Sequence, residues 1–223
     1  MPSISYAICA HNEHVELERL LTFLISKIEE EDEIVVQLDI TATAEVRSVV
    51  DRFSSKIKLI QFHQGLNADF STFKNYLKDA CTKDYIFNID ADELPAEWLM
   101  EKLKEILYTN YQIEVFLVPR INTVEGLTED HIAKWGWKVE NGRINSPDYQ
   151  WRIWKNKPEI KWINKVHEIL SGYTQYSALP NIDELCLIHH KDIKKQEKQN
   201  ELYDKIDKGI IVPIPNITAS SDQ

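Results

Sequence analysis

The chain has 223 residues, of which 43% are hydrophobic and 28% charged, a composition typical of a globular protein with one sizeable core. Its formal net charge of −10 disfavours non-specific attraction to nucleic-acid phosphates or anionic lipids. The N-terminus lacks a basic region followed by a long apolar core, and no apolar run approaches the length of a membrane span. We therefore expect a cytoplasmic protein without a membrane span.

The first half of the sequence predicts alternating strands and helices. Strands are expected at residues 3–10, 32–39, 56–64 and 84–92, and helices at residues 14–30, 42–54, 69–83 and 95–110. This alternation predicts an α/β fold with a doubly wound, mainly parallel sheet that carries helices on both faces. Ligands bind such sheets beyond the carboxyl ends of the strands, so the residues that follow each strand are the first candidates for a site.

After residue 110 the rhythm changes, and we expect a smaller mixed part. The sequence predicts strands at residues 111–121, 149–156 and 159–170, with an irregular excursion at 123–148 marked by Gly and Pro. A polar helix is expected at 192–209 and a loose tail at 211–223.

The stretch YIFNIDADELP, residues 85–95, gathers three carboxylates behind an expected strand. Asp90 and Asp92 stand at positions i and i+2, so both can face one cleft, whereas Glu93 should point to the opposite face. Two adjacent carboxylates repel each other, and a divalent cation such as Mg²⁺ or Mn²⁺ removes that conflict. Equally, Asp92 could cap the following helix, with Glu93 a solvated first-turn acid. Spacing alone leaves both interpretations open.

Several segments in chain order resemble the inverting GT-A glycosyltransferases of family 2. The segments are ISYAICAHNEHVELERLL, FSTFKNYLKDACTKDYIFNIDADE, YQWRIWKNKPEIKWINKVHEIL and LIHHKDIKKQEKQNELY, the last two being similar to lipopolysaccharide-core-type members. The resemblance implies one catalytic domain over residues 1–210, with a nucleotide-binding half at 1–95 and an acceptor-side half at 96–210. It also implies a nucleoside-diphosphate sugar donor, with a UDP-sugar favoured, a Mn²⁺ or Mg²⁺ cofactor and a hydroxyl acceptor, with a saccharide favoured.

The resemblance also assigns roles to residues. Asp92 is the expected metal ligand, Asp90 faces the ribose or shares the metal, and His189 is a further ligand. The expected contacts to the nucleotide-sugar come from Ala10, Asn12, Glu13, Asp39, Lys74, Asp90, Ala91 and Arg152, with Arg152 near the donor phosphates. The second strand ends in QLDITATAE, without the Gly-rich turn usual in the family, which leaves the base contact of Asp39 and the nucleotide open.

An inverting transfer also needs a base that deprotonates the acceptor hydroxyl. Glu168 is the first choice, with Asp130 and Glu129 as weaker candidates, although Glu168 could simply be an exposed strand acid. Three further residues are expected on the acceptor side, namely Trp135, Trp137 and His167. The two Trp side chains could form a stacking platform or a lid.

Other function classes stay open at this point. The acceptor could be a modified nucleic-acid base, as in phage DNA modification. A nucleotidyltransferase would share the fold type and the strand-end acids, but the first strand end, ICAHNEHVE, has no Gly or Lys to grip a triphosphate. A binding module that has lost the catalytic activity would not need the D-x-D motif, which Asp90 and Asp92 form in this sequence.

Overall fold

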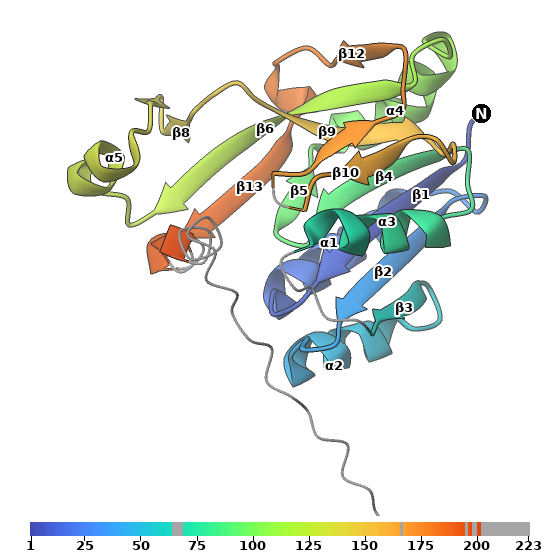
Figure 1. The fold of residues 1–223 in the computed structure, drawn as a ribbon, viewed down its shortest axis with the longest axis horizontal. Helices are drawn as coiled ribbons and strands as arrows, with labels where there is room; N and C mark the ends of the chain where they lie inside the picture. Colours follow the sequence, from blue (N-terminus) through green and yellow to red (C-terminus); the bar gives the residue numbers. More distant parts are fainter. Residues whose placement is uncertain (64–68, 166, 195, 198–199, 202–223) are drawn as a thin grey trace, which may run out of the picture.

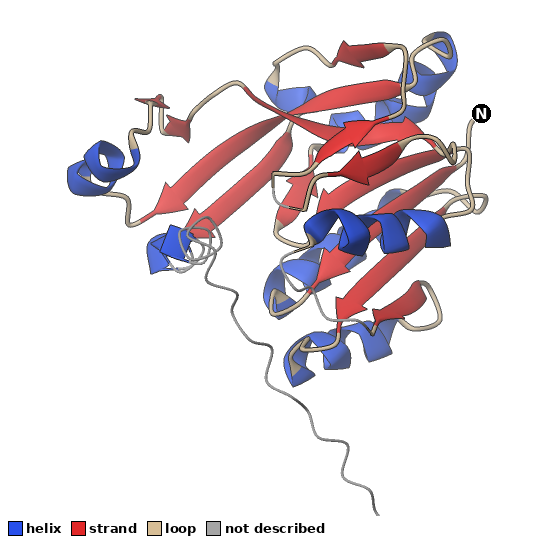
Figure 2. Ribbon diagram, viewed as in Figure 1, coloured by secondary structure: helices blue, strands red, loops and turns tan. Residues whose placement is uncertain are grey.

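A computed structural model describes residues 1–63, 69–165, 167–194, 196–197 and 200–201 (Figures 1 and 2). The first half alternates strands and helices: β1 (Ile4–Ala10), α1 (His14–Lys27), β2 (Glu33–Asp39), α2 (Ala44–Phe53), β3 (Lys58–Phe62), α3 (Phe70–Ala80), β4 (Tyr85–Asp90), β5 (Glu93–Pro95) and α4 (Glu97–Thr109). The second half contains β6 (Val115–Glu125), α5 (Glu129–Trp135), β7 (Val139–Glu140), β8 (Arg143–Ile144), β9 (Asp148–Lys155), β10 (Lys161–Ile163), β11 (Ile169–Ser171), β12 (Tyr176–Ala178), a 3-10 turn at Asp183–Leu185 and β13 (Leu187–Asp192).

The centre of the fold is a nine-stranded sheet with the order β3-β2-β1-β4-β9-β6-β13-β5, in which β12 pairs with the start of β6. Neighbouring strands from β3 to β4 are parallel, whereas β9 is antiparallel to both β4 and β6. Strand β13 is parallel to β6, and β5 is antiparallel to β13. The expected α/β class with a mainly parallel sheet is confirmed.

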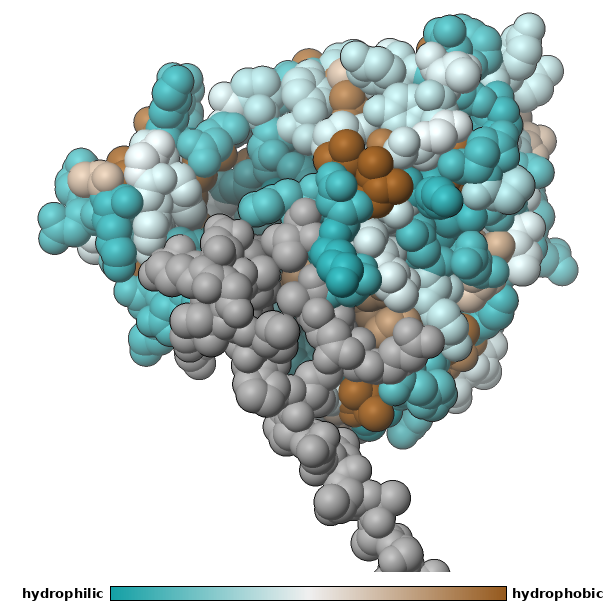
Figure 3. All heavy atoms as spheres, viewed as in Figure 1, coloured by the Kyte–Doolittle hydropathy of each residue, from teal (hydrophilic) through white to brown (hydrophobic). Residues whose placement is uncertain are grey.

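Helices cover both faces of this sheet because its strands are apolar on both sides. On β1, Ile4, Tyr6 and Ile8 belong to the core under α1, α2 and α4, whereas Ala7 belongs to a second core on the other face. That second core is closed by α3 and by the β10–β11 hairpin, which lie in front of the sheet in Figure 1. The alternation follows the two-residue period of a strand. Figure 3 shows that the outside of this face is mostly hydrophilic, with only small hydrophobic patches.

Two expectations for the second half were wrong. The excursion at 123–148 is not irregular throughout, because it contains α5 and the β7–β8 hairpin. Thr128 caps α5, and Gly136 ends it with a φ of +64°, which is the usual Thr and Gly punctuation of a helix. The strand expected at 159–170 is a hairpin of β10 and β11, and in the turn between them Asn164 and His167 have positive φ angles.

The expected tail at 211–223 and most of the expected polar helix at 192–209 lie outside the described residues. Within the described ranges, every helix is too short or too polar to cross a lipid bilayer.

Candidate active site

The strand order brings several polar segments to one edge of the sheet. Strands β1, β2, β4, β6 and β13 all end there, because they run in the same direction. Strand β9 runs the other way and therefore begins at the same edge. The edge thus collects the end of β4 with its D-x-D, the middle of β13 with His189 and the start of β9 with Asp148.

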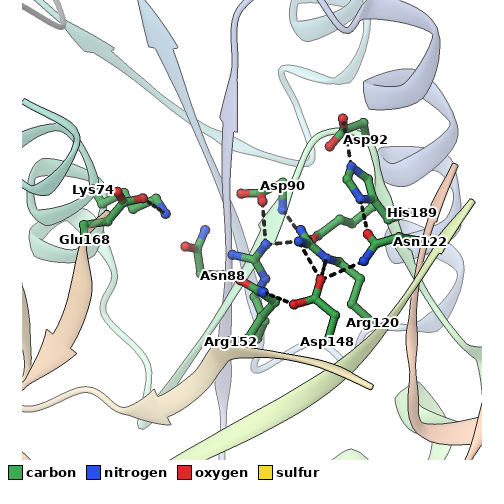
Figure 4. A network of polar contacts seen from close by, with 12 residues as sticks. Lys74, Asn88, Asp90, Asp92, Arg120, Asn122, Asp148, Arg152, Glu168 and His189 are labelled. Atoms are coloured by element: carbon green, nitrogen blue, oxygen red, sulfur yellow. Dashed lines mark hydrogen bonds and ion pairs between the residues drawn. The ribbon is translucent and has the colours of Figure 1, made fainter. Parts of the chain in front are cut away.

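An ion-pair network fills the space behind the end of β4 (Figure 4). Arg152 Nη2 lies 2.5 Å from Asp90 Oδ2 and 2.6 Å from Glu93 Oε1, and Arg120 Nη1 lies 2.9 Å from the same Glu93 oxygen. The side chain of Glu93 is 0% exposed and that of Arg152 is 3% exposed. Burial opposes the charge on Asp90, but the guanidinium of Arg152 holds its pKa below the ordinary value.

This network corrects two expectations. Glu93 does not point away from the site, because residues 91–92 form a turn that restarts the alternation of side chains before β5. Its carboxylate instead accepts a hydrogen bond from the backbone N–H of Asp90 at 3.1 Å and binds two guanidinium groups. Arg152, expected near donor phosphates, faces the carboxylates of Asp90 and Glu93.

Asp92 and His189 lie side by side next to this network. His189 Nε2 is 3.3 Å from Asp92 Oδ2, and the side chain of His189 is 8% exposed. Burial opposes the charge on Asp92, and the contact with His189 nevertheless lowers its pKa. His190 lies on the opposite face of β13, where it is exposed and contacts Thr123, as the alternation of a strand predicts.

Three residues outside the sequence-predicted site, namely Asn122, Asp148 and Arg120, form a connected group next to His189. Asn122 Oδ1 lies 2.7 Å from His189 Nδ1, and Asn122 Nδ2 donates to Asp148 Oδ2 at 2.7 Å. Arg120 grips Asp148 through Nε and Nη2, both at 2.8 Å. The pairing of β6 with both β9 and β13 brings them together. No local sequence motif predicts the pairing of β6 with β9 and β13. The only signal for Arg120, Asn122 and Asp148 in the sequence is that they are polar residues within the β6 and β9 segments.

Lys74 and Glu168 form an ion pair on the α3 side of the edge. Lys74 Nζ lies 2.5 Å from Glu168 Oε1 and 4.5 Å from the centre of the Trp162 ring. The next residue, Asn75, makes hydrogen bonds of 2.9 Å to both the N–H and the C=O of Trp162, which fixes α3 against the hairpin. Residues expected at the diphosphate and on the acceptor side are therefore in direct contact, and Figure 4 shows them apart from Asp92 and His189. His167 is exposed in the hairpin turn.

The ends of β1 and β2 form a separate cluster. Asp39 is buried, and its Oδ1 accepts hydrogen bonds from the N–H and the hydroxyl of Thr41, whose Oγ1 also lies 3.0 Å from His11 Nε2. Glu13 folds back and accepts from the backbone N–H groups of His11 and Asn12 at 2.9 and 3.0 Å. Asn12 is exposed, whereas Ala10 and Ala91 are buried core residues.

An arm formed by α5 and the β7–β8 hairpin projects from the sheet (Figure 1). Trp135 packs between His131 and Trp137, with ring centres 5.0 and 4.7 Å apart. Asp130 and Glu129 are exposed in the first turn of α5. A pocket of about 370 Å³ lies between the arm and the sheet. Its lining includes Asn122, Trp137, Ile144, Asp148, His189 and Lys191.

The described residues contain no group of three or more His, Cys, Asp or Glu side chains that could hold a metal ion. Asp92 and His189 offer one carboxylate and one imidazole, while Asp90 is already paired with Arg152. Mg²⁺ and Mn²⁺ are commonly held by one or two protein ligands together with phosphate oxygens and water. The residues therefore fit a divalent cation shared with a diphosphate, and do not fit a cation enclosed by protein alone.

A protein-family model and several solved structures match this chain. The model of glycosyl transferase family 2 matches residues 5–176. No curated protein matches the chain. Residues 1–349 of S. aureus TarS superpose with a TM-score of 0.59 at 14% identity. The same fragment in complex with UDP gives a TM-score of 0.60 at 15% identity, covering 85% of this chain and 60% of that one. Its complex with UDP-GlcNAc gives 0.53 at 14% identity, covering 83% and 60%.

The chain thus spans about 60% of the TarS fragment that it matches, and at these identities the structural likeness shows the fold. The family model spans well over half of the sequence and includes β1, β4 with its D-x-D, and β9. This chain belongs to glycosyl transferase family 2.

Proposed function

We propose that the protein transfers a sugar from a nucleoside-diphosphate sugar to a hydroxyl group of a saccharide, with inversion at the anomeric carbon. The observation that carries this proposal is the contact between Asp92 and His189, at 3.3 Å, beside the pocket that Trp137 lines. A cation site and an acceptor-sized pocket then share one wall, which is the arrangement that a transfer between two substrates needs.

A divalent cation, Mn²⁺ or Mg²⁺, bound by Asp92 and His189 would offset the charge that develops on the leaving diphosphate. Asp90 then lies toward the ribose, since its carboxylate is held by Arg152. Asp39 and Asn12, at the ends of β2 and β1, are the proposed nucleoside contacts. The solved complexes of TarS with UDP and UDP-GlcNAc support a UDP-sugar as the donor.

The pocket under the arm is the proposed acceptor site. Trp137 offers an aromatic face, on which sugars commonly stack, and the amide and carboxylate groups of Asn122 and Asp148 offer hydrogen bonds to hydroxyls. Trp135 supports Trp137 from behind. This mixture of one aromatic face and several polar groups favours a saccharide over a nucleic-acid base, which would need a slot between apolar faces.

Glu168 is the proposed base. It lies on the α3 side of the sheet edge and not in the lining of the pocket, so a saccharide held in the pocket has to extend along the edge for its hydroxyl to reach Glu168. The pairing of Glu168 with Lys74 gives it a way to respond to the donor. The Lys74 ammonium lies 2.5 Å from Glu168 Oε1 and so occupies the oxygen that would accept the proton. If Lys74 moves to the donor phosphates, Glu168 is released to accept the proton of the acceptor hydroxyl. The freed oxygen then attacks the anomeric carbon from the face opposite the diphosphate, which inverts its configuration. Asp148 is a poor base because Arg120 holds it through a hydrogen bond from Nε and an ion-pair contact from Nη2.

Titration calorimetry with UDP in the presence and absence of Mn²⁺ tests the cation site. We expect Mn²⁺ to strengthen UDP binding to the wild type, and Asp92→Asn to lose that dependence. Asp51→Asn, an exposed change on α2, is the matched control. Equal Mn²⁺ dependence in wild type and Asp92→Asn would contradict the proposal.

Glu168→Gln tests the base. We expect UDP binding to survive, while transfer from UDP-sugars to an oligosaccharide panel falls at least about 100-fold. Unchanged transfer would assign the base elsewhere. Transfer only to a hydroxymethylated DNA duplex would contradict a saccharide acceptor, and release of pyrophosphate from a nucleoside triphosphate would contradict glycosyl transfer.

A further inference from the structure

The side chain of Asn122 lies between a carboxylate and an imidazole. Strand pairing sets His189 directly beside Asn122 on parallel neighbours β13 and β6. One end of the Asn122 amide lies 2.7 Å from Asp148 Oδ2, and the other end lies 2.7 Å from His189 Nδ1. Both contacts have hydrogen-bond distances, so each end of the amide has a defined partner.

Asp148 decides which end of the amide is which. An ionised carboxylate only accepts hydrogen bonds, so the amide atom facing Asp148 has to be the NH₂ group. Asp148 is itself fixed, because Arg120 Nε donates to its Oδ2 at 2.8 Å and Arg120 Nη2 lies 2.8 Å from the same oxygen. The amide oxygen of Asn122 therefore faces His189.

The amide oxygen in turn decides the tautomer of His189. Since an oxygen only accepts, Nδ1 of His189 has to carry the hydrogen. In the neutral ring the lone pair then sits on Nε2, which lies 3.3 Å from Asp92 Oδ2. In this neutral state two acceptors face each other, whereas a ring that also carries a hydrogen on Nε2 would donate to Asp92, which is the contact that lowers the pKa of Asp92. A cation bound to both atoms takes the place of that hydrogen and turns the repulsion into attraction.

We propose that Asn122, oriented by Asp148, is a positioning residue that holds His189 as the Nδ1–H tautomer and so presents the Nε2 lone pair toward Asp92 as a cation ligand. The proposal rests on the proposed cation site. It adds a series of hydrogen bonds that runs from Arg120 through Asp148 and Asn122 to His189 and fixes the orientation of each group. The four residues of this series come from β6, β9 and β13, so the tautomer of His189 is set by the pairing of three strands.

The neighbouring residues supply a matched control. One position further along both strands, Thr123 Oγ1 lies 2.8 Å from His190 Nδ1, and His190 lies on the opposite face. Thr123→Val removes this hydrogen bond from the same strand pair and leaves His189 and its partners in place.

The tautomer is read from long-range ¹H–¹⁵N spectra of the protein with ¹⁵N-labelled histidine, without metal, at about pH 8.5. The signal of His189 is identified by its absence in His189→Gln. We expect a protonated Nδ1 and an unprotonated Nε2 in the wild type and in Thr123→Val. In Asn122→Ala we expect both tautomers. Binding of Mn²⁺ in the presence of UDP, followed by electron paramagnetic resonance of free Mn²⁺, should weaken about 10- to 100-fold in Asn122→Ala and stay unchanged in Thr123→Val.

A wild-type Nε2–H tautomer, or a ring protonated on both nitrogens, would overturn the proposal. So would an Asn122→Ala protein that keeps one tautomer and full Mn²⁺ affinity. If Asn122→Ala does not fold, Asp148→Asn replaces it, because an amide at residue 148 lets the Asn122 amide turn over and should also produce both tautomers. A wild type that binds no Mn²⁺ with UDP would refute the proposed cation site, whereas the spectra still decide the role of Asn122.

Discussion

Replacing Glu93 by Gln tests how strongly the polar network behind the D-x-D supports the fold. Glu93 is fully buried and accepts from Arg152 at 2.6 Å, from Arg120 at 2.9 Å and from the backbone N–H of Asp90 at 3.1 Å. Glutamine keeps the shape and one acceptor oxygen. However, its NH₂ group would face another donor, and two guanidinium groups would lose the carboxylate between them.

The size of the effect follows from these contacts. Breaking a buried ion pair by removing one partner costs about 3–5 kcal/mol, and the acceptor oxygen that glutamine retains places the expected loss at about 3 kcal/mol. For a chain of this length, each kcal/mol shifts the melting temperature by about 2–4 °C. We therefore expect Glu93→Gln to melt about 6–12 °C below the wild type.

Urea unfolding followed by circular dichroism, together with calorimetric melting, measures this loss. Glu101→Gln is the control, because it removes a carboxylate from an exposed pair with Lys27 at 3.7 Å, and such pairs contribute less than about 1 kcal/mol. If Glu93→Gln were no less stable than Glu101→Gln, the view that Glu93 holds two arginines in place would be refuted.

Two further predictions concern stability elsewhere in the fold. Hydrogen bonds from Lys157 and Thr174 lower the pKa of Glu114 from the ordinary 4.5 to about 2, so the stability they contribute is present above about pH 4.5 and is lost as the pH falls toward 2. Because the Lys157 side chain is 40% exposed, we expect the wild type to be only about 1–2 kcal/mol more stable than Glu114→Gln at pH 6. At pH 3 this difference in stability, measured by urea unfolding, should be less than half as large. An equal difference at both pH values would contradict the assignment. A methyl group on Gly172, where φ is +90°, would meet a backbone oxygen at 1.8 Å, so Gly172→Ala should lower the free energy of unfolding by about 3 kcal/mol or more. Gly142 has a φ of +75° and open space around it, so Gly142→Ala should lower it by only about 1 kcal/mol. Equal losses in a melting experiment would show that the backbone around Gly172 can shift to make room.

Much of the first half could be predicted from the sequence, because each of its elements has a local cause. The period of about 3.6 residues in Leu17, Leu20, Leu21 and Leu24 predicts α1, and these four side chains are buried. The end of β4 is marked by the change from apolar residues to Asp90. Such signals lie within one element, so they survive without knowledge of the neighbours.

The features that were missed depend on partners that are distant in sequence. Simple alternation predicts that Glu93 points to the opposite face, because it does not account for the turn at residues 91–92. The arginine partners of Glu93 lie 27 and 59 residues away. Asn122 gained its place only through the register of β6 against β13. The helix α5 differs from these cases, because Thr128 and Gly136 mark its two ends in the sequence itself. Its existence could therefore have been predicted from local signals.

The position of β9 also affects the order in which the protein can be completed. Strands β4 and β6 are neighbours in sequence among the long strands, yet β9, made later, separates them. Until β9 enters, both strands keep an open edge and Asp90 lacks its arginine. Such non-local pairing is slow to form. Recovery of the contact between Asp90 and Arg152 during refolding therefore reports that β9 has joined the β4 half of the sheet to the β6 half.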